Sequence, residues 1–100
     1  MTRVHDRFAS LRNATASALL NAPGATAAEL RQAVANGSAP PDLTALVEKI
    51  RSRAYTVTDQ DVDTLRNRYS EDQLFDIIVA AAFGAARERV AAAQRALDEA

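Results

Sequence analysis

Apolar residues recur every three or four positions in five segments of the chain, which is the spacing of one helical face. In the first segment the apolar positions are Val4, Phe8, Leu11, Ala14 or Ala18, and Leu19. Three stretches interrupt the spacing: residues 21–26 and 36–42, which contain Pro and Gly, and the short stretch 55–58. The pattern predicts an all-α fold, a small five-helix bundle.

Local capping signals predict where the later helices begin. Thr26 with Glu29 is a capping-box pair for a short second helix, and Gly37 suits the end of that helix. We expect a third helix to begin near residues 41–42, where Pro precedes Asp. Two further pairs, Thr58 with Asp61 and Ser70 with Gln73, predict a fourth helix and a long fifth helix that reaches about Leu97. The expected buried positions are Leu30, Val34, Leu43, Leu46, Val47, Ile50, Val62 and Leu65.

The fifth helix is the most apolar segment, since Asp76 is the only charged residue between positions 74 and 86. One apolar stripe comprises Phe75, Val79, Ala82, Ala86, Val90, Ala93 and Leu97, and a second comprises Leu74, Ile77, Ile78, Ala81 and Ala85. A helix that is apolar nearly all round is buried on more than one side. We therefore expect one stripe to pack on the third and fourth helices and the other on a second subunit. The predicted oligomer interface is Leu74, Ile77, Ile78, Ala81, Gly84 and Ala85; the alternative is a monomer whose N-terminal helices cover the second stripe.

Composition supports a thin core. The chain has 100 residues, enough for a single helical domain with N-terminal helices over residues 1–37 and a helical region over 41–100. Hydrophobic residues make up 48% of the chain, but 23 of these residues are Ala, which adds little buried surface and favours helices that approach closely. A core this thin suggests completion by another chain.

Several classes of chemistry are disfavoured. The chain has no Cys, which excludes disulfides and thiolate chemistry, and its single histidine, His5, disfavours a metal site built from imidazoles. The 12 basic and 13 acidic residues nearly balance, which gives no general case for nucleic acid or an anionic membrane. The N-terminus lacks a signal-peptide pattern, and the longest uncharged run of the last segment, Ile77 to Ala86, is too short to span a bilayer. We expect a cytoplasmic protein without cofactor or metal.

Three segments carry a family resemblance: residues 57–65 (VTDQDVDTL), 69–76 (YSEDQLFD) and 80–87 (AAAFGAAR). With the preceding 46–50 (LVEKI), they resemble the C-terminal half of the AhpD-like (alkylhydroperoxidase D-like) and carboxymuconolactone decarboxylase superfamily, over about residues 43–97. The resemblance implies an all-α fold and homo-oligomers. The family's peroxidases carry Cys-x-x-Cys upstream of this region, and this chain has none, so the resemblance implies no thiol peroxidase activity.

Asp76 is the first candidate site residue, because a carboxylate within an apolar run can act as a general acid or base. It can equally be a structural residue that favours its own helix N-terminus and pairs with Arg53 or Arg66. Tyr69 and Tyr55, at helix junctions, can orient a ligand or seal the edge of the core.

The arginines give weaker candidates. Arg87 and Arg89 flank Glu88 and can bind an anion or form ion pairs. A second group can form a basic patch if the third and fourth helices are adjacent, although nothing else indicates nucleic-acid binding: Arg51, Arg53, Arg66 and Arg68. His5, near the terminus, is read as incidental.

Two functions follow from these observations. The first is a non-catalytic helical protein of the AhpD-like superfamily that forms a homo-oligomer or binds a protein partner. The second is a cysteine-free acid/base enzyme acting on a small molecule in an intersubunit pocket, with Asp76, Tyr69 and Arg87 as candidate catalytic residues. The substrate, the partner and the number of subunits are left open.

Overall fold

In the computed structural model, the described residues are 13–14, 17–21 and 23–99, and within them there are helices, turns and loops but no strand. The elements are α2 (Ala28–Ala35), α3 (Thr44–Arg53), the single-turn 3-10 helix η1 (Ala54–Thr56), α4 (Asp59–Asp63) and α5 (Glu71–Glu99). Residues 13–14 and 17–20 are also helical. The all-α fold and the long C-terminal helix are confirmed for this part of the chain. The predicted positions Val4, His5, Phe8 and Leu11 lie outside the described residues.

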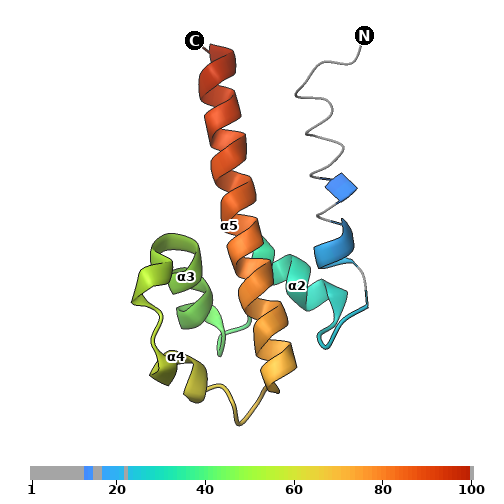
Figure 1. Ribbon diagram of the computed structural model, residues 1–100, viewed down its shortest axis with the longest axis vertical. Coiled ribbons are helices and arrows are strands. Elements are labelled where there is room, and N and C mark those ends of the chain that lie inside the picture. The colour runs from blue at the N-terminus through green and yellow to red at the C-terminus, as the bar shows by residue number, and fades with distance from the viewer. Residues whose placement is uncertain (1–12, 15–16, 22, 100) are drawn as a thin grey trace.

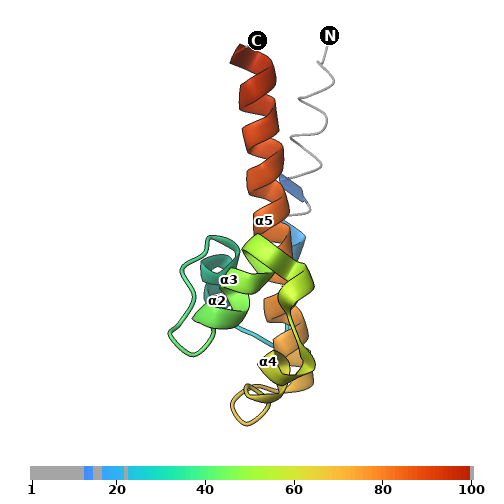
Figure 2. The same ribbon diagram turned by 90° about the vertical axis from the view of Figure 1, so that its left-hand side faces the viewer.

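The long helix α5 organises the other elements. Its 29 residues make it about 43 Å long at about 1.5 Å per residue. Helices α2 and α3 pack against its first half and α4 lies near its N-terminal end, while its second half extends past all three (Figures 1 and 2). The fold therefore gives one helix two different surroundings.

The core lies between α2, α3 and the first half of α5. Val34, Leu43 and Ile77 are the largest side chains that are fully buried. The predicted core positions Leu46, Val47, Ile50 and Leu65 are also buried, whereas Leu30 and Val62 are half-buried. Core prediction from helical spacing is therefore largely confirmed for these helices.

Helices α2 and α5 touch at Gly84. A Cβ at this position would lie 2.0 Å from the carbonyl oxygen of Ala35 and 2.7 Å from its Cα atom. Only glycine fits such an approach, since no side-chain carbon can come that close to a backbone oxygen. The expected close helix contact is present, but it joins two helices of one chain.

Two of the three predicted capping boxes form. In α4, the Asp61 amide donates to Thr58 Oγ1 and the Asp61 carboxylate accepts from the Thr58 amide. In α5, Gln73 and Ser70 exchange the same pair of bonds, at 3.1 and 2.8 Å. Both boxes are specified within four residues, which is why the sequence alone could predict them.

The box predicted at Thr26 is wrong. Helix α2 begins one residue later, with Ala27 as its N-cap and no side-chain capping bond. Its other end is as predicted: Gly37 has φ +82°, and the amides of Gly37 and Ser38 reach back to Val34 and Ala33. That pair of bonds is the Schellman arrangement.

The predicted oligomer interface lies inside the single chain. Ile77 and Ala81 are 0% exposed, and Leu74, Gly84 and Ala85 are also buried, with Ile78 half-buried. Helices α2 and α3 cover this stripe, and α2 is one of the N-terminal helices that the alternative placed there. In this packing five of the six positions are closed to a second subunit, and Ile78 is partly accessible.

The other stripe of α5 is the exposed one. Phe75 is 67% exposed, Val90 42% and Leu97 75%, and Ala82, Ala86 and Ala93 are also exposed, while Val79 is half-buried. We call these seven residues the outer stripe. The assignment of the two stripes is thus reversed relative to the sequence expectation.

Candidate functional site

Asp76, in the second turn of α5, anchors the segment that precedes α2. Its Oδ2 atom accepts bonds from the backbone amide and the hydroxyl of Thr26, at 3.2 and 3.3 Å. The two residues are 50 positions apart, and Thr26 is buried. Two donors from one residue hold the carboxylate in place, which explains why Thr26 does not cap α2.

A cavity of about 220 Å³ opens beside Asp76, and we call it the Asp76 pocket. Arg31 of α2 also lines it and is 5% exposed. A Cβ on Gly24 would lie 3.0 Å from Asp76 Oδ2 and 3.5 Å from the Arg31 guanidinium, so both charged groups lie against this glycine. The rest of the lining is apolar: Ala18, Leu19, Pro23, Phe75 and Val79.

Arg31 is held from the other side by the N-terminal segment, since its Nη1 donates to the carbonyl oxygen of Leu19 at 2.8 Å. Sequence reasoning did not single out this residue. A signal was present, because Arg31 precedes Val34 and Ala35 by three and four positions and so shares their buried helical face. A buried guanidinium beside a carboxylate is the main polar feature of the Asp76 pocket.

The arginine partners predicted for Asp76 are wrong. Arg66 lies 3.3 Å from Asp63 and 3.9 Å from Glu71, and Arg53 is exposed at the end of α3. The contacts of Asp76 come instead from Thr26. The structural role expected for Asp76 is supported, but with hydrogen-bond donors from a distant segment.

Tyr69 joins the turn before α5 to the start of α3. Its hydroxyl donates to Asp42 Oδ2 at 2.8 Å, and Arg68 lies 3.5 Å from the same oxygen. Desolvation, and then the Asp42 carboxylate, raise the pKa of the Tyr69 phenol. The phenol therefore stays protonated at neutral pH and acts as a fixed donor at the edge of the core. Tyr55, in contrast, is 87% exposed, so the prediction that it seals the core is wrong.

Arginines clamp the C-terminal ends of α2 and α3 to the middle of α5. Arg51 donates to the Ala35 carbonyl oxygen and forms a salt bridge with Glu88. The hydrogen bond from Arg51 to the Glu88 carboxylate holds the pKa of Glu88 below its usual range. Arg89 donates to the Arg51 carbonyl at 2.9 Å. Cations at helix C-termini complement the free carbonyl groups there, so this cluster has a structural explanation.

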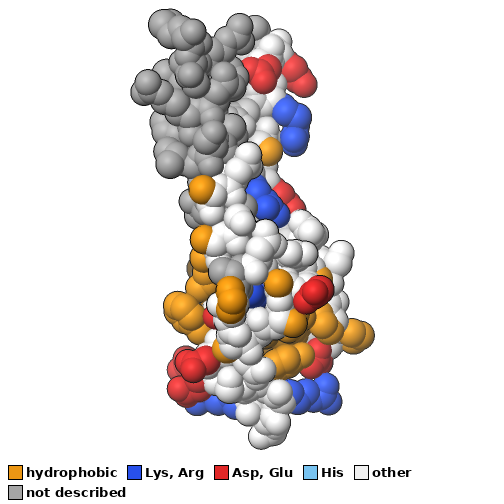
Figure 3. All heavy atoms as spheres, turned by 90° about the vertical axis from the view of Figure 1, so that its right-hand side faces the viewer, with side chains coloured by type: hydrophobic (Ala, Val, Ile, Leu, Met, Phe, Trp, Pro, Cys, Tyr) orange, Lys and Arg blue, Asp and Glu red, His pale blue; other side chains and the backbone are white. Residues whose placement is uncertain are grey.

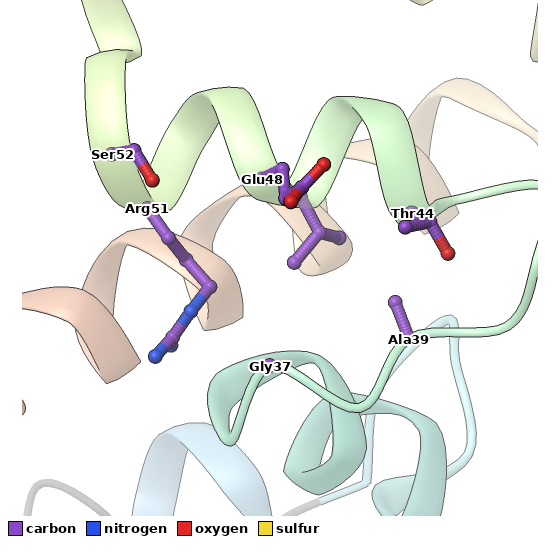
Figure 4. A pocket seen from close by; sticks show the side chains of 7 residues that line it. Gly37, Ala39, Thr44, Glu48, Arg51 and Ser52 are labelled. Carbon is purple, nitrogen blue, oxygen red and sulfur yellow. The ribbon is translucent and has the colours of Figure 1, made fainter.

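A second cavity, of about 160 Å³, lies between α3 and the loop after α2 (Figure 4). In Figure 4 the Arg51 side chain reaches from α3 toward Gly37 across this space. The guanidinium is already bonded to Ala35 and Glu88. The other polar side chains that line this cavity are Thr44, Glu48 and Ser52 of α3.

The three candidate catalytic residues are not brought together. Arg87 donates to Asn36 Oδ1 at 3.3 Å, stacks 5.4 Å from the Phe83 ring centroid and lines a separate cavity of about 410 Å³. Asp76 and Arg87 are 11 residues apart on one straight helix, or about 16 Å along its axis. Tyr69 is engaged by Asp42. Asp76 and Arg87 therefore line different cavities, and neither of these two cavities contains Tyr69.

The arginines of the expected basic patch are divided among carboxylates. Arg51 pairs with Glu88, Arg66 with Asp63 and Glu71, and Arg68 with Asp42. Figure 3 shows basic and acidic side chains side by side at one end of the molecule, with hydrophobic side chains reaching the surface above them. This arrangement does not produce a surface of one sign.

Among the described residues, no group of three or more His, Asp or Glu side chains is arranged to hold a metal ion. None of the helices in the described ranges is both long and apolar enough to cross a bilayer. Comparison with protein-family models, with curated proteins and with solved structures finds no match to this chain.

Proposed function

We propose that this chain is a non-catalytic helical subunit that acts by binding another protein chain, in the first instance a second copy of itself. The observation that carries the proposal is the outer stripe of α5. Phe75 and Leu97 are two-thirds to three-quarters exposed, and they lie on one face with exposed alanines and Val90 between them. An apolar face of this length on a soluble domain favours association with another surface.

The polar side chains support the same proposal, because they are bonded to one another within the chain. Asp76 is bonded to Thr26, Tyr69 to Asp42 and Glu88 to Arg51. Side chains that have structural partners are poorly placed to carry chemistry, since a substrate must displace those partners first. The association surface is thus the feature of α5 that the fold itself leaves unused.

We also propose that the chain belongs to the AhpD-like superfamily, without its thiol peroxidase activity. Support comes from the resemblance of residues 43–97 and from the capping boxes at Thr58 and Ser70, which begin two helices of that pattern. Superfamily membership favours homo-oligomers. The absence of Cys means that no residue of this chain can supply the disulfide chemistry.

The test is solution mass by light scattering over a wide range of protein concentration. We expect the mass to rise above the 10.7 kDa of one chain as the protein concentration increases. Leu97→Glu should remain a monomer, because it places a charge in the outer stripe. Ala92→Glu is the matched control: it adds the same charge at an exposed position on another side of α5 and should associate like the wild type. A wild type that stays monomeric throughout contradicts the proposal.

A second candidate function is acid/base chemistry or binding of a small molecule in the Asp76 pocket. The observation that favours it is the presence of Asp76 and Arg31 in one cavity with an otherwise apolar lining. The carboxylate can act as the base and the guanidinium can orient an anionic group. A ligand screen by NMR tests this candidate: shifts centred on Thr26 and Arg31, abolished in a folded Asp76→Asn variant, would favour it over the structural role.

A further inference from the structure

We infer that two copies of this chain pair through the outer stripe of α5 in an antiparallel, two-fold arrangement centred on Ala86. The inference rests on the proposed function, because it specifies the geometry of the self-association proposed there. Three observations carry it: the spacing of the stripe, the sizes of its residues and the position of the Asp76 pocket.

The spacing of the outer stripe is symmetric about Ala86. Phe75 and Leu97 each lie 11 residues from Ala86, on opposite sides. Val79 and Ala93 lie 7 residues away, and Ala82 and Val90 lie 4 residues away. In a two-fold interface, residue i of one copy contacts residue j of the other and the reverse contact repeats it. A face that is symmetric about its midpoint meets itself in register when the second helix runs in the opposite direction.

The stripe stays on one face along its whole length. Its two 11-residue halves correspond to about 3.67 residues per turn, close to the 3.6 of a straight α-helix. The apolar positions therefore drift little around α5 over about 33 Å. Two nearly straight helices can remain in contact over this distance without strong supercoiling.

The sizes of the residues also match in this register. Each Phe75 faces Leu97 of the second copy, so that the two largest exposed side chains of the outer stripe meet at both ends. Ala86 faces Ala86 at the centre, and each Ala82 faces Val90. Small residues at the centre allow the helices to approach closely, and large residues at the ends fill the space where the chains diverge.

The Asp76 pocket gives Leu97 of the second copy a place to bind. Phe75 and Val79 form one wall of this pocket, and Leu19 and Pro23 are among its other apolar lining residues. The volume of about 220 Å³ is larger than a leucine side chain needs, so the side chain can enter without displacing the wall. An exposed apolar side chain that fills a pocket on its partner is the usual form of an interface hot spot.

The area covered between the two copies indicates how stable the dimer is. A face about 33 Å long and about 10 Å wide gives roughly 700 Å² of covered surface for the two copies together. That lies below the ~1,200 Å² at which stable protein interfaces begin, and within the range of weak, transient complexes. We therefore expect a reversible dimer that forms at high protein concentration and dissociates on dilution.

The test uses single-cysteine variants, because the chain has no Cys of its own and the background is zero. Ala86→Cys is treated with a short bismaleimide at a concentration where light scattering shows association. Val79→Cys and Ala93→Cys are treated singly and as an equimolar mixture. In the antiparallel pair, like positions at 79 lie about 21 Å apart along the axis, whereas 79 faces 93.

We expect Ala86→Cys to cross-link with itself and the mixture of Val79→Cys and Ala93→Cys to cross-link far more than either variant alone. Leu97→Glu placed in the Ala86→Cys background should reduce cross-linking about tenfold or more, and Ala92→Glu should leave it unchanged. Self-cross-linking at position 79 as strong as at position 86 overturns the antiparallel register in favour of a parallel one. Association without cross-linking at 86 overturns this inference and leaves the proposed function standing, while absence of association at any concentration contradicts both.

Discussion

The two halves of α5 have similar alanine contents and opposite surroundings. From Glu71 to Ala85 the helix is held between α2 and α3, and it contributes six residues to the buried set. From Ala86 onward no residue of the helix is fully buried, and Val90 and Leu97 are exposed. Ten of the 23 alanines of the chain lie between Ala80 and Ala100, on both sides of this boundary.

The difference shows that alanine content alone does not decide which part of a helix is core. In the first half, small residues let α2 lie close to α5, as the contact between Gly84 and Ala35 shows. In the second half the same small residues extend past α2, α3 and α4, which lie beside the first half (Figures 1 and 2). The second half becomes a surface whose use depends on something outside the core.

The largest expected contrast comes from truncating one apolar side chain in each half. Ile77→Ala should lower the free energy of unfolding by about 2–5 kcal/mol, because it opens a cavity at a fully buried position. Leu97→Ala should change it by less than about 0.5 kcal/mol in dilute solution, since an exposed position loses little on truncation. Denaturant unfolding followed by circular dichroism measures both. Equal losses for the two variants would remove the distinction between the halves.

Gly84→Ala tests the helix crossing. By helix propensity alone this change stabilises by about 1 kcal/mol. The new Cβ would meet the Ala35 carbonyl at 2.0 Å, so we expect a net loss of about 1–3 kcal/mol instead. Ala86→Val, two residues away on the exposed face, is the control and should cost at most about 0.7 kcal/mol in propensity. A more stable Gly84→Ala variant in thermal unfolding contradicts the described packing of α2 on α5.

Asp76→Ala tests the anchor on the first half of α5. The change removes the acceptor of both Thr26 bonds, and we expect a loss of about 1.5–3 kcal/mol, the range for hydrogen bonds to charged groups. Faster hydrogen exchange at the Thr26 amide should accompany the loss. An Asp76→Ala variant as stable as the wild type, with an unchanged Thr26 amide, would show that the anchor contributes nothing.

The smallest effect is expected away from α5, at the Lys49–Asp61 ion pair between α3 and α4, which is 2.9 Å long and partly exposed. The bond to Lys49 lowers the pKa of Asp61 below its ordinary value of 3.8. A lowered folded-state pKa adds stability above the ordinary value, and that stability is lost as the pH falls through the folded pKa. Lys49→Met should therefore be less stable than the wild type at pH 7, with the difference shrinking at pH values below about 3.8. A difference that does not change with pH would assign the effect to packing rather than charge.

The helices and most core positions could be predicted because their signals are local. Thr58 with Asp61, and Ser70 with Gln73, complete their bonds within four residues, and Gly37 ends α2 through its own backbone conformation. Thr26 fits the same local rule with Glu29 and yet fails to cap. Its hydroxyl is taken by a carboxylate 50 residues away, a contact that no local pattern contains.

The candidate site was less predictable for a related reason. The sequence shows that α5 has two apolar stripes, but which one faces the core depends on where α2 lies, and that is set by the contact between Gly84 and Ala35. Arg31 was missed because an arginine on a short polar helix is usually solvated, and only the folded chain buries it beside Asp76. Both failures concern contacts between distant segments.

The most direct test of the divided role of α5 is hydrogen exchange along this helix at two protein concentrations, read by mass spectrometry. We expect slow exchange over residues 71–85 at both concentrations, because the core protects them. Over residues 86–99 we expect fast exchange in dilute protein and slower exchange in concentrated protein, as a second copy covers the outer stripe. Exchange over residues 86–99 that is slow already in dilute protein, or that does not respond to concentration, would contradict the account.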